Sequence, residues 1–138
     1  MNAMMLRYII AAMTGPVLIA ASVIISAAAP PTYETSIAKR LAPKYHAKLE
    51  VRLWDGARAD LVSDKVAWEV DWAKKWAEGV GQALYYAQVL EKEPGVILLT
   101  KDRKSDARYI YRCQTVCAAK GIRLRIEEVN EDGRIKVQ

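Results

Sequence analysis

The chain has 138 residues, the usual size of one domain, with apolar and charged contents (52% and 27%) that are typical of globular proteins. A net charge of +5 permits an anionic partner such as nucleic acid or a phospholipid surface, although no run of five like charges occurs. One histidine and no CxxC pair exclude a Cys/His zinc site.

The first part of the chain is an apolar head with a single charge, Arg7. Uncharged, mostly apolar residues follow from position 8, and small residues precede Pro30-Pro31. This order is typical of a secretory signal peptide, but the run is also just long enough to span a bilayer. We therefore expect residues 1–29 to be a signal peptide or a membrane anchor. An anchor would cross the membrane as an apolar helix at 8–29. Either alternative sends the body out of the cytoplasm, to the periplasm or the extracellular space.

The polar body, residues 32–138, is long enough to bury one core but not two. Apolar periodicity and turn residues predict three helices, at Thr32–Ala42, Ala73–Leu90 (stopped by Pro94-Gly95) and Ser105–Lys120. Strands are expected at Ala47–Trp54, Ala57–Val62, Val66–Trp72, Val96–Leu99 and Ile122–Ile126, with a small terminal hairpin at Asp132-Gly133.

The resulting order, α-β-β-β-α-β-α-β, starts with antiparallel hairpins and continues through crossovers. It predicts an α/β domain with one mixed sheet (α+β) that carries helices. Within it, Cys113 and Cys117 are four residues apart and would share a helix face. They could form a strained disulfide or be two small buried side chains, and burial is the favoured alternative.

Carboxylates gather around the second hairpin. Alternation in the third strand places Glu69 and Asp71 on one face. A two-residue turn at Ser63-Asp64 would place Asp60 opposite Ala67, with Glu69 as its diagonal neighbour about 7–8 Å away at Cα. Two such carboxylates can hold one Mg²⁺ or Mn²⁺ ion, with water and phosphate as the remaining ligands. Ordinary surface charge is the competing interpretation of each residue taken singly.

The helix that follows carries a polar stripe at Lys75, Gly79, Gln82 and Tyr86. Their spacing places all four on one side of the helix, which we expect to face the carboxylates. Lys75 could then stabilise charge on a phosphate, and Gln82 and Tyr86 could position a phosphodiester backbone. Glycine at position 79 suggests that a strand or a ligand comes close to this helix.

These residues resemble a family. Asp60, Glu69-Val70-Asp71 and the helix motif Gln82-Ala-Leu-Tyr-Tyr86 look like the PD-(D/E)XK nuclease superfamily, in particular its RecB-type and phage nucleases with a QxxxY motif. The resemblance implies an αβββαβ restriction-endonuclease-like core, here with an added αβ unit. It assigns Asp60 and Glu69 as metal ligands, and it places Glu34 where some members keep a helical glutamate near the metal.

One position departs from the family. The family's lysine stands two residues after the glutamate, where this chain has Asp71. Lys75, or Lys74, would have to supply the ammonium group instead. We therefore expect an exported or membrane-tethered, Mg²⁺-dependent nuclease acting on nucleic acid, DNA foremost and RNA as an option. The alternative is a catalytically inactive exported module that binds nucleic acid, an anionic surface or a protein.

Overall fold

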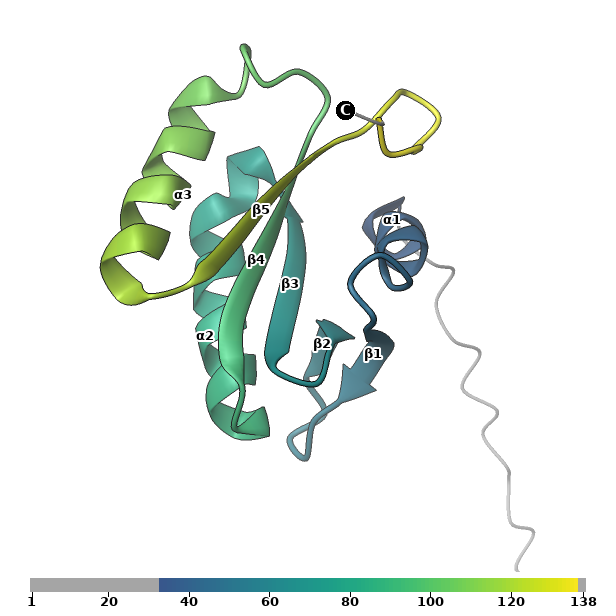
Figure 1. Cartoon of the computed structure of the whole chain (residues 1–138), viewed down its shortest axis with the longest axis vertical. Coiled ribbons are helices and arrows are strands. Elements are labelled where there is room, and N and C mark those ends of the chain that lie inside the picture. Colours follow the sequence, from purple (N-terminus) through teal and green to yellow (C-terminus); the bar gives the residue numbers. More distant parts are fainter. Residues whose placement is uncertain (1–32, 137–138) are drawn as a thin grey trace, which may run out of the picture.

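The structure is a computed structural model and describes residues 33–136. The predicted signal or anchor segment, Thr32 and Val137 lie outside the described residues. The described part has a five-stranded mixed sheet in the order β1-β2-β3-β4-β5, in which β1, β2 and β3 are antiparallel and β3, β4 and β5 parallel (Figure 1). Its elements are α1 (Tyr33–Leu41), β1 (Lys48–Arg52), β2 (Arg58–Val62), β3 (Val66–Trp72), the 3-10 turn η1 (Ala73–Lys75), α2 (Trp76–Leu90), β4 (Glu93–Thr100), α3 (Ala107–Lys120) and β5 (Arg123–Glu128). None of the described helices has the length and apolar character needed to cross a membrane.

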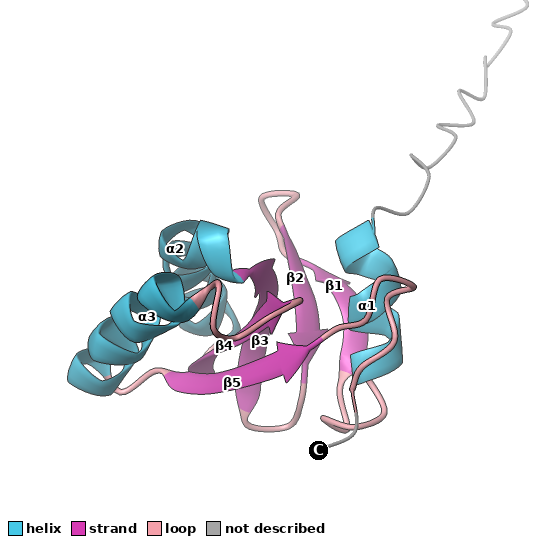
Figure 2. Ribbon diagram, turned by 90° about the horizontal axis from the view of Figure 1, so that it is seen from above, coloured by secondary structure: helices cyan, strands magenta, loops and turns pink. Residues whose placement is uncertain are grey.

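The sheet lies between two helical layers (Figure 2). α1 covers one face, where Ile37 and Leu41 pack on side chains of β2, β3 and β4. α2 and α3 cover the other face, where one apolar cluster contains Ala83 and a second contains Tyr86 and Leu53. β3 and β4 are therefore buried on both faces. The continuous apolar run 96–99 of β4 suits this position, whereas β3 buries Glu69 and Asp71 together with its apolar side chains.

The predicted element order is confirmed, and several boundaries differ. α2 is preceded by η1 and ends at Leu90, because Glu91 adopts a left-handed backbone (φ 52°). Pro94-Gly95 therefore does not stop the helix but lies inside β4, where Gly95 is paired with Trp68. A Cβ atom on Gly95 would lie 2.3 Å from a Trp68 ring carbon, so the indole packs directly on this glycine.

The C-terminal part follows the prediction more closely. Asp106 rather than Ser105 precedes the first residue of α3, and Gly121 ends the helix with φ 65°. The terminal hairpin is present as a bridge between Val129 and Ile135. Cys113 and Cys117 are free thiols, buried, with their Sγ atoms 3.6 Å apart. Burial without a disulfide, the favoured alternative, is confirmed.

Candidate active site

The β2–β3 hairpin brings Asp60 and Glu69 together in a register that differs from the prediction. The paired residues are Leu61 with Trp68 and Val62 with Ala67. Ser63 N–H donates to Val66 O at 2.9 Å, so the two turn residues are Asp64 and Lys65. Continuing this register by one residue places Asp60 beside Glu69 itself. The prediction that Asp60 lies opposite Ala67 is wrong by two residues, and an even shift keeps the carboxylates on their expected face.

The side chain of Asp60, on β2, accepts a hydrogen bond from the backbone of β3. Its Oδ2 accepts a hydrogen bond from Val70 N–H at 3.0 Å. Burial raises the pKa of this carboxyl group to about 6, although the Val70 hydrogen bond and the charge of Arg58 act in the opposite direction. Arg58 itself pairs with Glu50 at 3.2 Å. Asp60 is therefore held firmly in place, with one oxygen already engaged by the backbone.

Glu69 is the most perturbed group of the site. Glu69 is 7% exposed, and its Oε2 atom is buried without a hydrogen-bond partner. Burial, followed by the charges of Asp60 and Asp71, raises the pKa of Glu69 to about 9. A buried carboxylate without a partner is unfavourable, so this side chain either keeps its proton or requires a cation beside it.

Asp71 and Lys75 connect the end of β3 to η1. Asp71 is 4% exposed, and burial raises its pKa to about 6, against the effect of the Trp72 N–H donor at 2.8 Å. Lys75 Nζ lies 3.8 Å from Asp71 Oδ1 and 3.2 Å from Glu34 Oε1. The hydrogen bond to Glu34 is the largest cause that raises the pKa of Lys75. The ammonium group is therefore shared between two carboxylates at the mouth of the site.

Helix α1 reaches the site through its first turn. The ring of Tyr33 stacks on Trp72 with centroids 5.9 Å apart and planes 2° from parallel. This contact ties the start of α1 to the end of β3, and it places Glu34 beside Lys75. The expectation that Glu34 lies near the candidate metal residues agrees with this position.

Helix α2 approaches the carboxylates through Gly79. A Cβ atom at this position would lie 3.3 Å from Asp71 Cβ and 3.9 Å from Glu69 Cγ, so the expected close approach is to β3. A Cβ atom at Gly81 would meet no atom outside its own helix and neighbours within 4 Å, so nothing in the structure explains this glycine. Gln82, one turn further along, also lines the site.

Two predicted residues lie elsewhere. Tyr86 is 6% exposed and packs in the apolar cluster around Leu53, so it stands behind the site rather than at its surface. Burial, followed by the charges of Glu69 and Asp60, raises its pKa to about 12. Lys74 points to a different hollow, which it shares with residues of the β4–α3 loop. Of the two candidate lysines, only Lys75 lines the carboxylate site.

The site is a polar cavity of about 170 Å³, which we call the carboxylate cavity. Its walls carry five carboxylates and two cations: Glu34, Asp60, Glu69, Asp71, Glu78, Arg58 and Lys75. The prediction missed Arg58 and Glu78, although both could have been found. Arg58 is two residues from Asp60 on the same strand, and Glu78 is three residues after Lys75, a spacing that places two helical residues on neighbouring parts of one side.

The cavity is not a ready-made metal cage. Among residues 33–136, no group of three or more His, Cys, Asp or Glu side chains is arranged to hold a metal ion. The three predicted ligands, Asp60, Glu69 and Glu34, do line one cavity, but Glu34 is engaged by Lys75. An ion here would be bound by two carboxylates, with further ligands from water or substrate.

Comparison with known proteins adds no assignment, because no family model, curated protein or solved structure matches the chain.

Proposed function

We propose that this chain is a metal-dependent nuclease-like protein that hydrolyses phosphodiester bonds in DNA or RNA. The proposal is carried by the carboxylate cavity, where Asp60, Glu69 and Asp71 converge and Glu69 Oε2 is buried without a partner. The αβββαβ order from Tyr33 to Thr100 supports a restriction-endonuclease-like core. The similarity of Asp60, Glu69 and Gln82 to the PD-(D/E)XK motif adds the reaction class.

The donor set fits a hard divalent cation. Asp60 has one oxygen free of the Val70 N–H, and Glu69 offers an unpartnered oxygen. A cation between them would lower the pKa of both groups and remove the cost of burying two adjacent carboxylates. When bound, Mg²⁺ or Mn²⁺ would act as a Lewis acid toward a phosphoryl oxygen.

The protein groups would divide the remaining work. Lys75 Nζ, shared with Glu34 and Asp71, would exchange one of these partners for a phosphate oxygen and stabilise its developing charge. In the family, a lysine stands at the position of Asp71. In this assignment Lys75 supplies the ammonium group that the family takes from that lysine. Gln82 would position the strand through its side-chain amide, and Tyr86 would support the cavity from behind.

A second candidate function has an observation in its favour. Lys75 already forms an ion pair with Glu34, and the carboxylates are not arranged as a metal cage. A protein of this kind could bind nucleic acid, an anionic surface or a protein partner without cutting. In that case Glu69 would keep its proton and serve only as a buried packing group.

Cleavage assays separate the two functions. The full-length chain is incubated with supercoiled and with single-stranded DNA, in Mg²⁺, in Mn²⁺ and in EDTA. The matched variants are Glu69→Gln and Glu78→Gln, which remove one carboxylate each from the same cavity, the first buried and the second exposed. We expect metal-dependent cleavage by the wild type and Glu78→Gln, and none by Glu69→Gln. Inactive wild type, or equal activity in all three, would refute catalysis.

We further propose that residues 33–136 act outside the cytoplasm, exported or tethered by the apolar segment at 8–29. The support is the sequence of that segment. The test is protease digestion of intact cells and of cells with a permeabilised outer layer. Resistance of the domain until the cytoplasmic membrane is broken would contradict export.

A further inference from the structure

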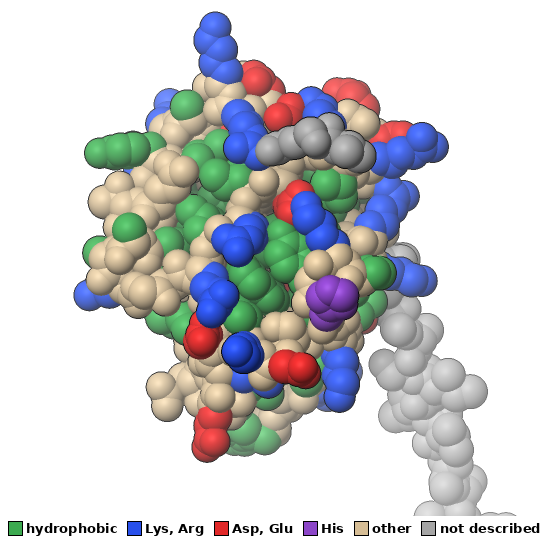
Figure 3. All heavy atoms as spheres, in the orientation of Figure 1, with side chains coloured by type: hydrophobic (Ala, Val, Ile, Leu, Met, Phe, Trp, Pro, Cys, Tyr) green, Lys and Arg blue, Asp and Glu red, His purple; other side chains and the backbone are tan. Residues whose placement is uncertain are grey.

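Another hollow lies on the face of the sheet opposite α2 and α3. It has a volume of about 940 Å³ and is formed by α1, the turn that follows it, β5 and the terminal hairpin. Figure 3 shows lysine and arginine side chains gathered around an apolar hollow on the face seen in Figure 1. We call it the basic groove, and its basic side chains are Arg40, Lys44, His46, Arg125 and Lys136.

The one carboxylate among the described residues that line the groove is Glu127, and its charge is already balanced. It is 6% exposed and accepts hydrogen bonds from Lys44 Nζ at 2.6 and 2.9 Å. Tyr45 Oη donates a third at 2.5 Å. Glu127 therefore anchors the turn after α1 to β5 and balances Lys44, while Lys136 pairs with Glu128 at the edge of the groove.

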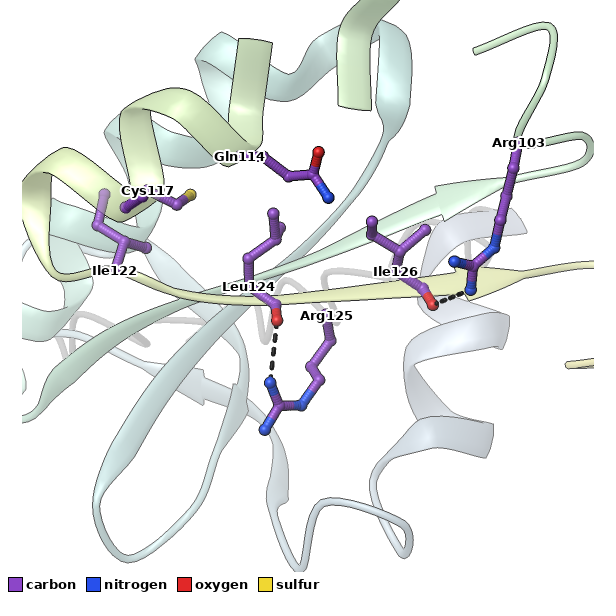
Figure 4. Close-up of a pocket in the computed structure, with 8 residues that line it drawn as sticks. Arg103, Gln114, Cys117, Ile122, Leu124, Arg125 and Ile126 are labelled. Carbon is purple, nitrogen blue, oxygen red and sulfur yellow. Dashed lines mark hydrogen bonds between the residues drawn. The ribbon is translucent and has the colours of Figure 1, made fainter. Parts of the chain in front are cut away.

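Two arginines at the groove have no carboxylate partner among the described residues. Arg40 Nη1 donates to Asp132 O at 3.5 Å, and Arg125 Nη1 donates to Leu124 O at 3.0 Å. Both partners are backbone carbonyls, and neither guanidinium forms an ion pair within the described part of the chain. In Figure 4, Leu124 points toward α3 while Arg125 extends from the opposite side of β5. Arg125 thus faces the groove, with Arg40 contributed by α1.

The carboxylate cavity has the opposite charge balance, with more carboxylates than cations. A polyanion would be repelled there, so binding energy for a nucleic acid has to come from another surface. Helix α1 joins the two places. Glu34 in its first turn lines the cavity, and Arg40 in its last turn lines the groove. Arg40 is six positions after Glu34, a rise along the helix of about 9 Å.

We propose that the basic groove binds the phosphodiester backbone of a nucleic-acid strand, which continues along α1 to the carboxylate cavity. Arginine suits this role because its planar guanidinium binds two phosphate oxygens at once. A strand fits the concave shape between α1 and β5, whereas a flat lipid surface would not enter the groove. The inference takes its substrate class from the proposed function but does not depend on cleavage.

Binding without cleavage tests it. The affinity of the full-length chain for a short fluorescein-labelled single-stranded oligonucleotide is measured by anisotropy in EDTA, over a series of salt concentrations. The test variant is Arg40→Gln with Arg125→Gln. The matched control, Arg108→Gln with Arg112→Gln, removes the same charge from exposed positions of α3 on the other face. A third variant, Arg40→Lys with Arg125→Lys, keeps the charge, and thermal melting checks folding of all three.

The expected result is a loss of affinity of about tenfold or more at low salt for the Gln pair in the groove, with a salt-dependence slope lower by about 1.4, since each phosphate contact to a single strand contributes about 0.7. The α3 control should keep the wild-type slope, and the Lys pair should keep most of it. Equal losses for groove and control would overturn the inference, as would binding to anionic phospholipid vesicles but not to the oligonucleotide. Absence of cleavage alongside groove-dependent binding would refute the proposed catalysis and leave this inference standing.

Discussion

The charge state of Glu69 offers the sharpest test of the site. The pKa of this carboxyl group is about 9 in the folded protein, against an ordinary value of 4.5. A raised folded-state pKa means that stability is complete below the ordinary value and is lost as the pH rises toward the folded value. The metal-free protein should therefore become less stable between weakly acidic and alkaline pH. Asp60 and Asp71, with pKa values of about 6, act in the same direction over a lower range.

The magnitude follows from the shift. At pH 7 the folded protein keeps the Glu69 proton, whereas the unfolded chain, with the ordinary pKa, has lost it. Each pKa unit corresponds to about 1.4 kcal/mol, so the interval between the ordinary pKa and neutral pH lowers the free energy of unfolding by about 3 kcal/mol. Glu69→Gln has nearly the same shape and cannot ionise. In EDTA, we expect the variant to match the wild type at about pH 4 and to exceed it by up to about 3 kcal/mol at about pH 7.

Urea unfolding at several pH values measures this difference, and Glu78→Gln serves as the control because Glu78 is exposed. Adding Mg²⁺ at neutral pH should then stabilise the wild type, by about 2.7 kcal/mol at a hundredfold excess over the dissociation constant, and stabilise Glu69→Gln less. Parallel pH dependence of wild type and Glu69→Gln would refute the reasoning from burial. Equal stabilisation of both by Mg²⁺ would refute Glu69 as a ligand.

Three further outcomes follow from the structure. Lys75→Ala should lower the cleavage rate about 10²-fold or more in a nuclease assay, and Lys74→Ala should leave it unchanged, because only Lys75 lines the carboxylate cavity. The reverse pattern would assign the stabilisation of phosphate charge to Lys74. Gly81→Ala should raise the free energy of unfolding by about 1 kcal/mol, whereas Gly79→Ala should show no such gain in the same urea titration, because its Cβ would lie 3.3 Å from another side chain. Gly95→Ala should cost about 1–3 kcal/mol, because the new Cβ would overlap the indole packed on it; an unchanged midpoint would show that the ring moves freely.

Local patterns in the sequence were sufficient for the element order and for part of the site. Strict alternation in β3 determines that Glu69 and Asp71 share a face, whatever the strand pairs with. Helical spacing likewise places Gly79 and Gln82 on one side of α2. These are short-range properties of the backbone, and the structure agrees with each of them.

The hairpin register needed the tertiary structure. Two adjacent two-residue turns fit the same sequence, and they differ by two residues in what lies beside Asp60. The structure has the turn one residue later, with the Ser63 hydroxyl bonded to both Val66 N–H and Val66 O at 3.1 Å. Such a contact depends on the folded turn, so composition alone could not select it.

Periodicity also could not tell which parts of one helix stripe reach solvent. Lys75 and Tyr86 belong to one predicted stripe, yet Lys75 lies in η1 at the mouth of the cavity, whereas Tyr86 lies in α2 and packs in the core with Leu53. The basic groove is a stronger case, since Arg40 and Arg125 meet only after α1 and β5 have packed on one face of the sheet. The sequence by itself determined which carboxylates point the same way. Only the tertiary structure decided their burial, and with it the raised pKa of Glu69 on which the proposed metal site depends.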